Sequence, residues 1–158
     1  MKNRGFEVVD EKHIKIKEVK TQLPFHGSSS SAGYDLFSKE NVVIKSGEKY
    51  RFTTDIKAYM RPDEVLKIYV RSSIGMKKGL VLTNTVAIID ADYYNNPSND
   101  GNMMVELLNT SPESQSIEIG ERIAQGVFVK KLDADTGTFQ RPENYDRTGG
   151  IGSSNDKK

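Results

Sequence analysis

The feature that most constrains the fold is that the apolar residues come in short, β-branched runs separated by turn residues. Between Tyr34 and Lys131 such runs include Val42–Ile44, Val65–Val70 and Val127–Val129. Short segments of this kind, at this spacing, are typical of a β-sandwich or β-barrel. No segment shows the long 3.6-residue periodicity of an amphipathic helix. The sequence therefore predicts an all-β domain.

Two shorter segments predict further elements. A single short helix is expected from Ser72 to Lys78, with Gly79 as its C-cap. Closer to the N-terminus, apolar and charged residues alternate from His13 to Val19, which is the pattern of a half-buried strand.

The composition changes after the last predicted strand. Residues 133–158 contain only Phe139, Tyr145 and Ile151 as large apolar groups. A segment of this kind buries too little surface to offset the entropy of ordering it. We therefore divide the chain into a β domain, residues 1–132, and a mobile C-terminal arm, residues 133–158. The arm is either a frayed end or a lid that a ligand orders, and its glycine pattern favours the lid.

Composition restricts the class of protein. The chain has 158 residues, no cysteine and a formal charge of +1. This length suits one domain with its own core. The absence of cysteine excludes disulfides and thiolate metal sites and suits a cytoplasmic location. No apolar run approaches the ~18 residues of a membrane span, and the balanced charge argues against a broad nucleic-acid surface. We expect neither a membrane nor a nucleic acid as partner.

The chemistry is concentrated in residues 84–93, where an apolar run delivers two carboxylates and an aromatic ring to one turn. Val86, Ile88 and Ile89 predict a buried strand that ends at Asp90. A carboxylate at such a place is open to pKa tuning and is a candidate general base. Taken alone, the segment is more typical of a strand that ends in a tight aspartate turn.

Four other motifs accompany this segment in order. The five are residues 32–36 (AGYDL), 71–73 (RSS), 84–93 (NTVAIIDADY), 120–125 (GERIAQ) and 147–154 (RTGGIGSS). The series resembles the five motifs of the trimeric dUTP pyrophosphatases (dUTPases) over most of the chain. The resemblance implies a jelly-roll homotrimer with a mobile arm, which hydrolyses dUTP to dUMP and pyrophosphate with Mg²⁺.

The resemblance also implies residue roles. Asp90 would activate the water that attacks the α-phosphorus, and Tyr93 would pack under the deoxyribose and exclude a 2′-hydroxyl. Asn84 would help to read uracil, and Asp35 would support the water shell of the Mg²⁺ ion. Substrate contacts would also come from Arg71, Ser72, Ser73, Gln125, Arg147, Gly149, Gly150 and Ile151. Ile151 stands where the family has an aromatic residue that caps the base. Shared sites are implied, with Asp90, Asn84 and Tyr93 from a neighbouring subunit and the arm from the third.

Two alternatives remain open at this point. The dCTP deaminases share the fold and the RSS motif, and Glu106 falls at the position of their catalytic glutamate, so the chain could be a deaminase or a bifunctional enzyme. A glutamate inside an apolar strand must be exposed, paired or functional. The second alternative is a nucleotide-sensing regulator that binds a protein partner through the loop of residues 94–100, which is longer than the family's usual turn.

Overall fold

The computed structural model describes residues 2–135, and within this range almost all regular structure is β. The strands are β1 (Gly5–Val8), β2 (Phe25–His26), β3 (Tyr34–Phe37), β4 (Val42–Ile44), β5 (Lys49–Thr53), β6 (Ile56–Tyr59), β7 (Glu64–Val70), β8 (Leu80–Leu82), β9 (Ala87–Asp90), β10 (Met104–Asn109), β11 (Gln115–Ile117) and β12 (Arg122–Lys130). Three short helical segments, η1 (Glu11–His13), η2 (Ser73–Lys77) and η3 (Ala91–Tyr93), lie between them. The all-β prediction is confirmed.

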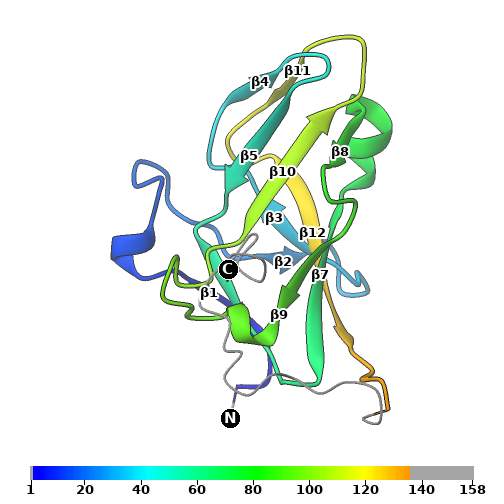
Figure 1. Cartoon of the computed structure of the whole chain (residues 1–158). Helices are drawn as coiled ribbons and strands as arrows, with labels where there is room; N and C mark the ends of the chain where they lie inside the picture. The colour runs from blue at the N-terminus through cyan, green and yellow to red at the C-terminus, as the bar shows by residue number, and fades with distance from the viewer. Residues whose placement is uncertain (1, 136–158) are drawn as a thin grey trace, which may run out of the picture.

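The strands form antiparallel sheets that face a common interior (Figure 1). The largest sheet has the order β2-β3-β12-β7-β9, and a three-stranded sheet has the order β5-β10-β8. Two smaller pairs, β1-β6 and β11-β4, complete the described fold. Antiparallel strands bury one face and leave the other to water, which gives β10 its strict alternation of buried and half-buried residues.

The core lies between the two larger sheets. Fully buried side chains from both sheets fill it, among them Leu36, Phe52, Leu66, Ile68, Leu107 and Ile123. Each contributes about 1.5–3 kcal/mol to the free energy of unfolding. Because this core is contiguous, it fixes the strand ends from which the site residues project.

The predicted helix is present. Helix η2 (Ser73–Lys77) lies inside the expected span, and Gly79 ends it with a left-handed backbone, φ +64°. The Gly79 amide donates to the Gly75 carbonyl at 3.1 Å. A residue with a Cβ would be strained at Gly79, so this position explains where the helix stops.

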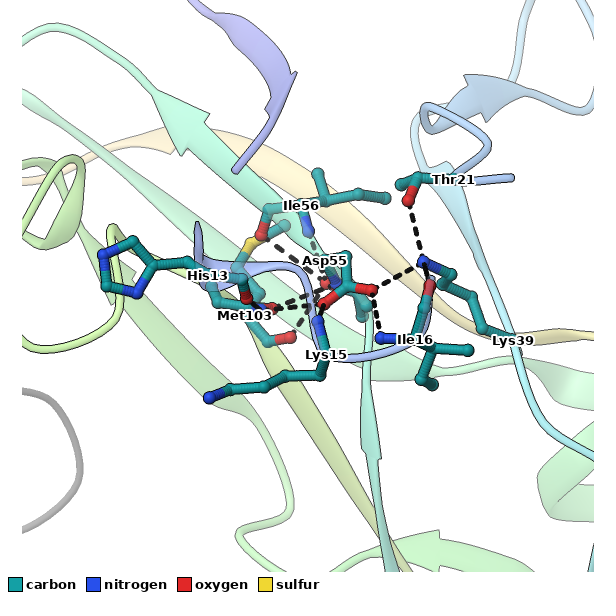
Figure 2. Close-up of polar contacts among 10 residues, drawn as sticks. His13, Lys15, Ile16, Thr21, Lys39, Asp55, Ile56 and Met103 are labelled. Carbon is teal, nitrogen blue, oxygen red and sulfur yellow. Dashed lines mark hydrogen bonds and ion pairs between the residues drawn. The ribbon is translucent and has the colours of Figure 1, made fainter. Parts of the chain in front are cut away.

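The predicted strand from His13 to Val19 is wrong. Residues 11–13 form the 3₁₀ helix η1, and the segment after it is irregular. The backbone amides of Lys15 and Ile16 donate to the two carboxylate oxygens of Asp55, at 2.9 and 3.1 Å, as Figure 2 shows. A distant side chain supplies the acceptors that a neighbouring strand would have supplied, so no strand pairing is needed there.

Asp55 and Lys39 form the buried ion pair that anchors this segment. Their side chains are 0% and 4% exposed, and the Lys39 ammonium lies 2.5 Å from Asp55 Oδ2. Lys39 also donates to the Ile16 carbonyl and to Thr21 Oγ1, at 2.7 and 2.8 Å (Figure 2). Burial alone would raise the pKa of Asp55, but the hydrogen bonds from Lys39, Asn102 and the two amides outweigh it and lower that pKa.

Within residues 2–135, no helix is long and apolar enough to cross a membrane.

Candidate active site

One half of the candidate site is organised by Asp35 on β3. Its carboxylate is almost fully buried and pairs with two guanidinium groups. Arg71 Nη1 donates to Oδ1, and Arg122 Nη1 donates to Oδ2 at 3.3 Å. Two arginines on one carboxylate leave a net positive charge, and the cluster is therefore suited to an anionic ligand.

Strand register explains why these residues meet. On β12, Gln125 lies opposite Asp35 of β3 and Tyr69 of β7. The β3–β12 register shifts between Arg122 and Ala124, so the strand contains a bulge. In a regular strand, residues three apart face opposite sides, but the extra residue lets Arg122 reach the carboxylate that lies beside Gln125.

Gln125 and the two serines border this cluster. Ser72 and Ser73 are exposed at the start of η2, next to Arg71. The Gln125 side chain lies over Gly33, where a Cβ would come within 2.5 Å of Gln125 Oε1. Glycine at position 33 therefore makes room for the glutamine. Arg71, Ser72, Ser73 and Gln125, which the sequence predicted as substrate contacts, come together at one end of β7.

Asp90 and Tyr93 form a second cluster. Asp90 ends β9 half-buried, and Tyr93 is 7% exposed in η3 immediately after it. The Tyr93 hydroxyl donates to the Asn102 carbonyl at 3.1 Å. The strand that delivers Asp90 is less buried than predicted, because Ile88 is 52% exposed. Among the described strands, β9 lies at the edge of its sheet and pairs with β7 alone.

The two clusters lie at opposite ends of β7. Asp90 is opposite Val65, whereas Arg71 follows Val70. Five residues of strand separate these positions by about 17 Å. Figure 1 shows the same arrangement, with η2 beside β8 and η3 at the far end of β9. Among the residues that the structure describes, the predicted base Asp90 therefore lies far from Arg71, Ser72 and Gln125 of the same chain.

Asn84 lies in the tight turn that joins β8 to β9. The turn is exposed, Thr85 adopts φ +60°, and the Asn84 carbonyl accepts hydrogen bonds from the Val86 amide and the Thr85 hydroxyl, both at 2.6 Å. The Asn84 side chain is left at the surface, so an external ligand can reach its amide. The remaining predicted contacts lie outside the described residues: Arg147, Gly149, Gly150 and Ile151.

Glu106, on which the deaminase alternative depends, is paired. Arg51 and Lys49 on the neighbouring strand approach its carboxylate to 2.8 and 3.4 Å, and Thr83 donates to it at 3.1 Å. Burial alone would raise the pKa of Glu106, but these hydrogen bonds lower it. A carboxylate held as an anion by two cations is a poor general base. The ion pairs with Arg51 and Lys49 also explain why an otherwise apolar strand contains a glutamate.

Sequence reasoning missed Arg122 and Gly33. Both stand inside recognised motifs, but their roles depend on partners from other strands. A signal for Arg122 was present, because Ile123 and Ala124 are consecutive apolar residues where strand alternation expects one. In residues 2–135, no group of three or more His, Cys, Asp or Glu side chains is placed to bind a metal ion.

Comparisons with known proteins fit this arrangement. The dUTPase family model matches residues 19–155, and the Lactococcus lactis deoxyuridine 5′-triphosphate nucleotidohydrolase is 47% identical over 98% of this chain and 99% of its own. The chain belongs to the dUTPase family. The Histophilus somni enzyme of the same name is 37% identical over 85% of this chain and 88% of its own.

Solved structures agree with the family assignment. The dUTPase from Streptococcus mutans is 41% identical, covers 83% of this chain and 98% of its own, and superimposes with a TM-score of 0.73. The dUTPase from phage phi11 of S. aureus, at 21% identity and a TM-score of 0.67, shares the fold. The predicted dUTPase-like jelly roll is confirmed, and the family does not favour the deaminase or regulator alternatives.

Proposed function

We propose that this protein hydrolyses dUTP to dUMP and pyrophosphate. The observation that carries the proposal is that this dUTPase-family chain presents two complementary half-sites. One is a cationic cluster on Asp35 bordered by Ser72 and Gln125, and the other is a half-buried carboxylate, Asp90, beside a fixed aromatic ring. The first suits a triphosphate and the second suits the activation of water next to a sugar.

In the proposed reaction, Asp90 accepts a proton from a water molecule whose oxygen bonds to the α-phosphorus. The bond from the α-phosphorus to the oxygen that bridges to the β-phosphorus breaks, and pyrophosphate leaves with that electron pair. A positioned base of this kind typically contributes roughly 10²–10⁴-fold to the rate. Arg71, Ser72, Ser73 and Gln125 hold the phosphates, because guanidinium, hydroxyl and amide groups all donate to phosphate oxygens. Arg147, Gly149 and Gly150 are proposed to add contacts from the C-terminal segment.

Specificity is assigned to Tyr93 and Asn84. A ring flush against C2′ of the sugar leaves no space for a ribose hydroxyl, which rejects UTP by steric clash. Asn84 offers both a donor and an acceptor to the uracil edge. Because Ile151 replaces the family's aromatic residue in the sequence, we propose that it makes an aliphatic contact with the base in place of aromatic stacking.

The separation of the half-sites supports a homotrimer. Because Asp90 and Arg71 lie at opposite ends of β7, one chain cannot place both against one α-phosphorus. We propose that Arg71, Ser72 and Gln125 of one subunit face Asn84, Asp90 and Tyr93 of a second. The C-terminal segment of the third closes each site. Each of the three sites in the trimer then contains one copy of every motif.

Mg²⁺ is the proposed metal. The chemistry of the donor set fits an ion held mainly by the substrate, because both oxygens of Asp35 already accept from arginines and the ion binds readily through phosphates and water. Asp35 remains the proposed second-sphere contact through those waters. When bound, Mg²⁺ offsets the negative charge of the triphosphate. A cytoplasmic location and a protein partner at residues 94–100 stay predictions.

The decisive experiment offers dUTP, dCTP and UTP separately with Mg²⁺ and follows pyrophosphate and the base of the product. Rapid pyrophosphate release from dUTP, with little from UTP and none from dCTP, is the expected result. A uracil nucleotide formed from dCTP would instead support the deaminase alternative at Glu106. Binding without turnover of any of the three would contradict an enzymatic function and support the regulator.

A further inference from the structure

The hydroxyl of Tyr93 is held from two sides. It donates to the Asn102 carbonyl at 3.1 Å, and it accepts from Asn99 Nδ2 at 2.8 Å. The same Asn99 amide also donates to the Asn102 carbonyl at 3.1 Å. A phenol held as both donor and acceptor cannot move without breaking these two hydrogen bonds, so the ring has one fixed position.

The orientation of the Asn99 amide is itself fixed. Its Oδ1 accepts from the Gly101 backbone amide at 3.1 Å and from Asn96 Nδ2 at 2.7 Å. Since a backbone N–H can only donate, Oδ1 must face Gly101, and Nδ2 must therefore face the tyrosine. The loop sets the direction of the hydrogen bond to Tyr93.

Asn96 closes the loop around the same tyrosine. Its Nδ2 also donates to the Tyr93 carbonyl at 3.0 Å, and its Oδ1 accepts from the Ser98 and Asn99 amides at 3.0 and 3.2 Å. Asp100 anchors the far end, because its buried carboxylate lies 2.8 Å from the Lys57 ammonium. The loop that the sequence marked as unusually long is thus folded against Tyr93.

We propose that Asn99, oriented by Asn96 and Gly101, is a positioning residue that fixes the Tyr93 ring and thereby sets the discrimination between deoxyribonucleotide and ribonucleotide. This inference rests on the proposed function, since it takes Tyr93 as the wall against C2′. The Tyr93 ring can exclude a 2′-hydroxyl by steric clash only if the ring does not move away from the sugar. Asn99 supplies that rigidity without touching the substrate.

The test is a double-mutant cycle read as the ratio of kcat/KM for dUTP to kcat/KM for UTP. Asn99→Ala removes the donor to the phenol, and Tyr93→Phe removes the phenol and keeps the ring. Each single variant should lower the ratio about three- to tenfold, as expected for one buried neutral hydrogen bond. The double variant should lose less than the product of the two single losses, because the hydrogen bond from Asn99 to Tyr93 is shared by both substitutions and is lost only once.

Asn41→Ala is the matched control. Asn41 Oδ1 accepts from the Ile119 backbone amide at 2.9 Å, so this variant also loses a side-chain hydrogen bond, but one between two residues that belong to neither half-site. Its dUTP to UTP ratio should equal that of the wild type. Asn99→Asp is a second variant for the case that Asn99→Ala fails to fold, because it keeps an acceptor for Gly101 and cannot donate to Tyr93.

Three results would overturn the proposal: an unchanged ratio in the Asn99 variants, additive losses in the double variant, or a parallel fall of kcat/KM for both substrates. The last is what a merely structural role produces. Absence of dUTP turnover in the wild-type protein would refute the proposed function separately. In that case, the affinities of the wild type and of Asn99→Ala for dUMP and UMP are measured at equilibrium. A preference of the wild type for dUMP that Asn99→Ala abolishes would support the role of Asn99. No preference in the wild type, or a preference that the variant keeps, would reject it.

Discussion

The buried pair between Lys39 and Asp55 offers a sharp test of how the N-terminal segment is held. Lys39→Met keeps most of the side-chain volume and removes a donor that serves three acceptors, Asp55 Oδ2, the Ile16 carbonyl and Thr21 Oγ1. It leaves a carboxylate of 0% exposure without its cation. Breaking a buried ion pair in this way costs about 3–5 kcal/mol, a large part of the roughly 5–15 kcal/mol that stabilises a typical domain.

The dependence on pH gives this prediction a sign. In the wild type the pKa of Asp55 is lowered, so its contribution to stability is present above its ordinary value of 3.8 and is lost as the pH falls through the lowered pKa. In Lys39→Met, burial remains and the ammonium is gone, so the pKa of Asp55 should be higher than in the wild type. The folded variant then takes up its proton at a higher pH than the folded wild type, and the free-energy difference between the two proteins should shrink as the pH falls from neutrality.

The assay is urea unfolding followed by far-ultraviolet circular dichroism, at one protein concentration because subunit association adds to apparent stability. Lys130→Met is the control, since the Lys130 and Asp63 side chains are 70% and 53% exposed and such a pair contributes at most about 1 kcal/mol. Lys39→Met/Asp55→Asn should be more stable than Lys39→Met, because no uncompensated charge remains. A loss below about 1 kcal/mol in Lys39→Met, or a difference that grows on acidification, would refute the reasoning.

Three further predictions concern the reaction and the fold. Asp90→Asn should lower kcat for dUTP by roughly 10²–10⁴-fold with nucleotide affinity retained, measured by pyrophosphate release and by calorimetric titration; normal turnover would exclude Asp90 as the base. Removal of residues 146–158 should lower kcat much more than it weakens binding, and unchanged rates would show that this segment takes no part in catalysis. The Tyr94 phenol donates to Glu7 at 2.6 Å, and this bond, with burial, raises the pKa of Tyr94 to about 12. Tyr94 should therefore titrate late in absorbance at alkaline pH, and its step near pH 12 should be missing in Tyr94→Phe. Its contribution to stability should be lost as the pH rises from its ordinary pKa of 10 toward 12.

The amino-acid sequence alone determined the local structure and the motifs. Short β-branched runs predicted the strands, and Gly79 predicted the end of the helix, because strand alternation and a left-handed glycine depend on neighbouring residues. The motif series located Asp90, Tyr93, Arg71 and Gln125 before any fold was known. These features need no knowledge of what packs against them.

Tertiary structure decided everything that depends on a distant partner. The segment from His13 to Val19 alternates like a strand, but its amides bind a carboxylate 39 or 40 residues away in the chain. Glu106 is a paired anion because β5 places Arg51 and Lys49 beside it. Likewise, the bulge that brings Arg122 to Asp35 and the separation of Asp90 from Arg71 along β7 follow from strand register. Strand register is set by packing across the whole core. It therefore could not be predicted from this sequence alone.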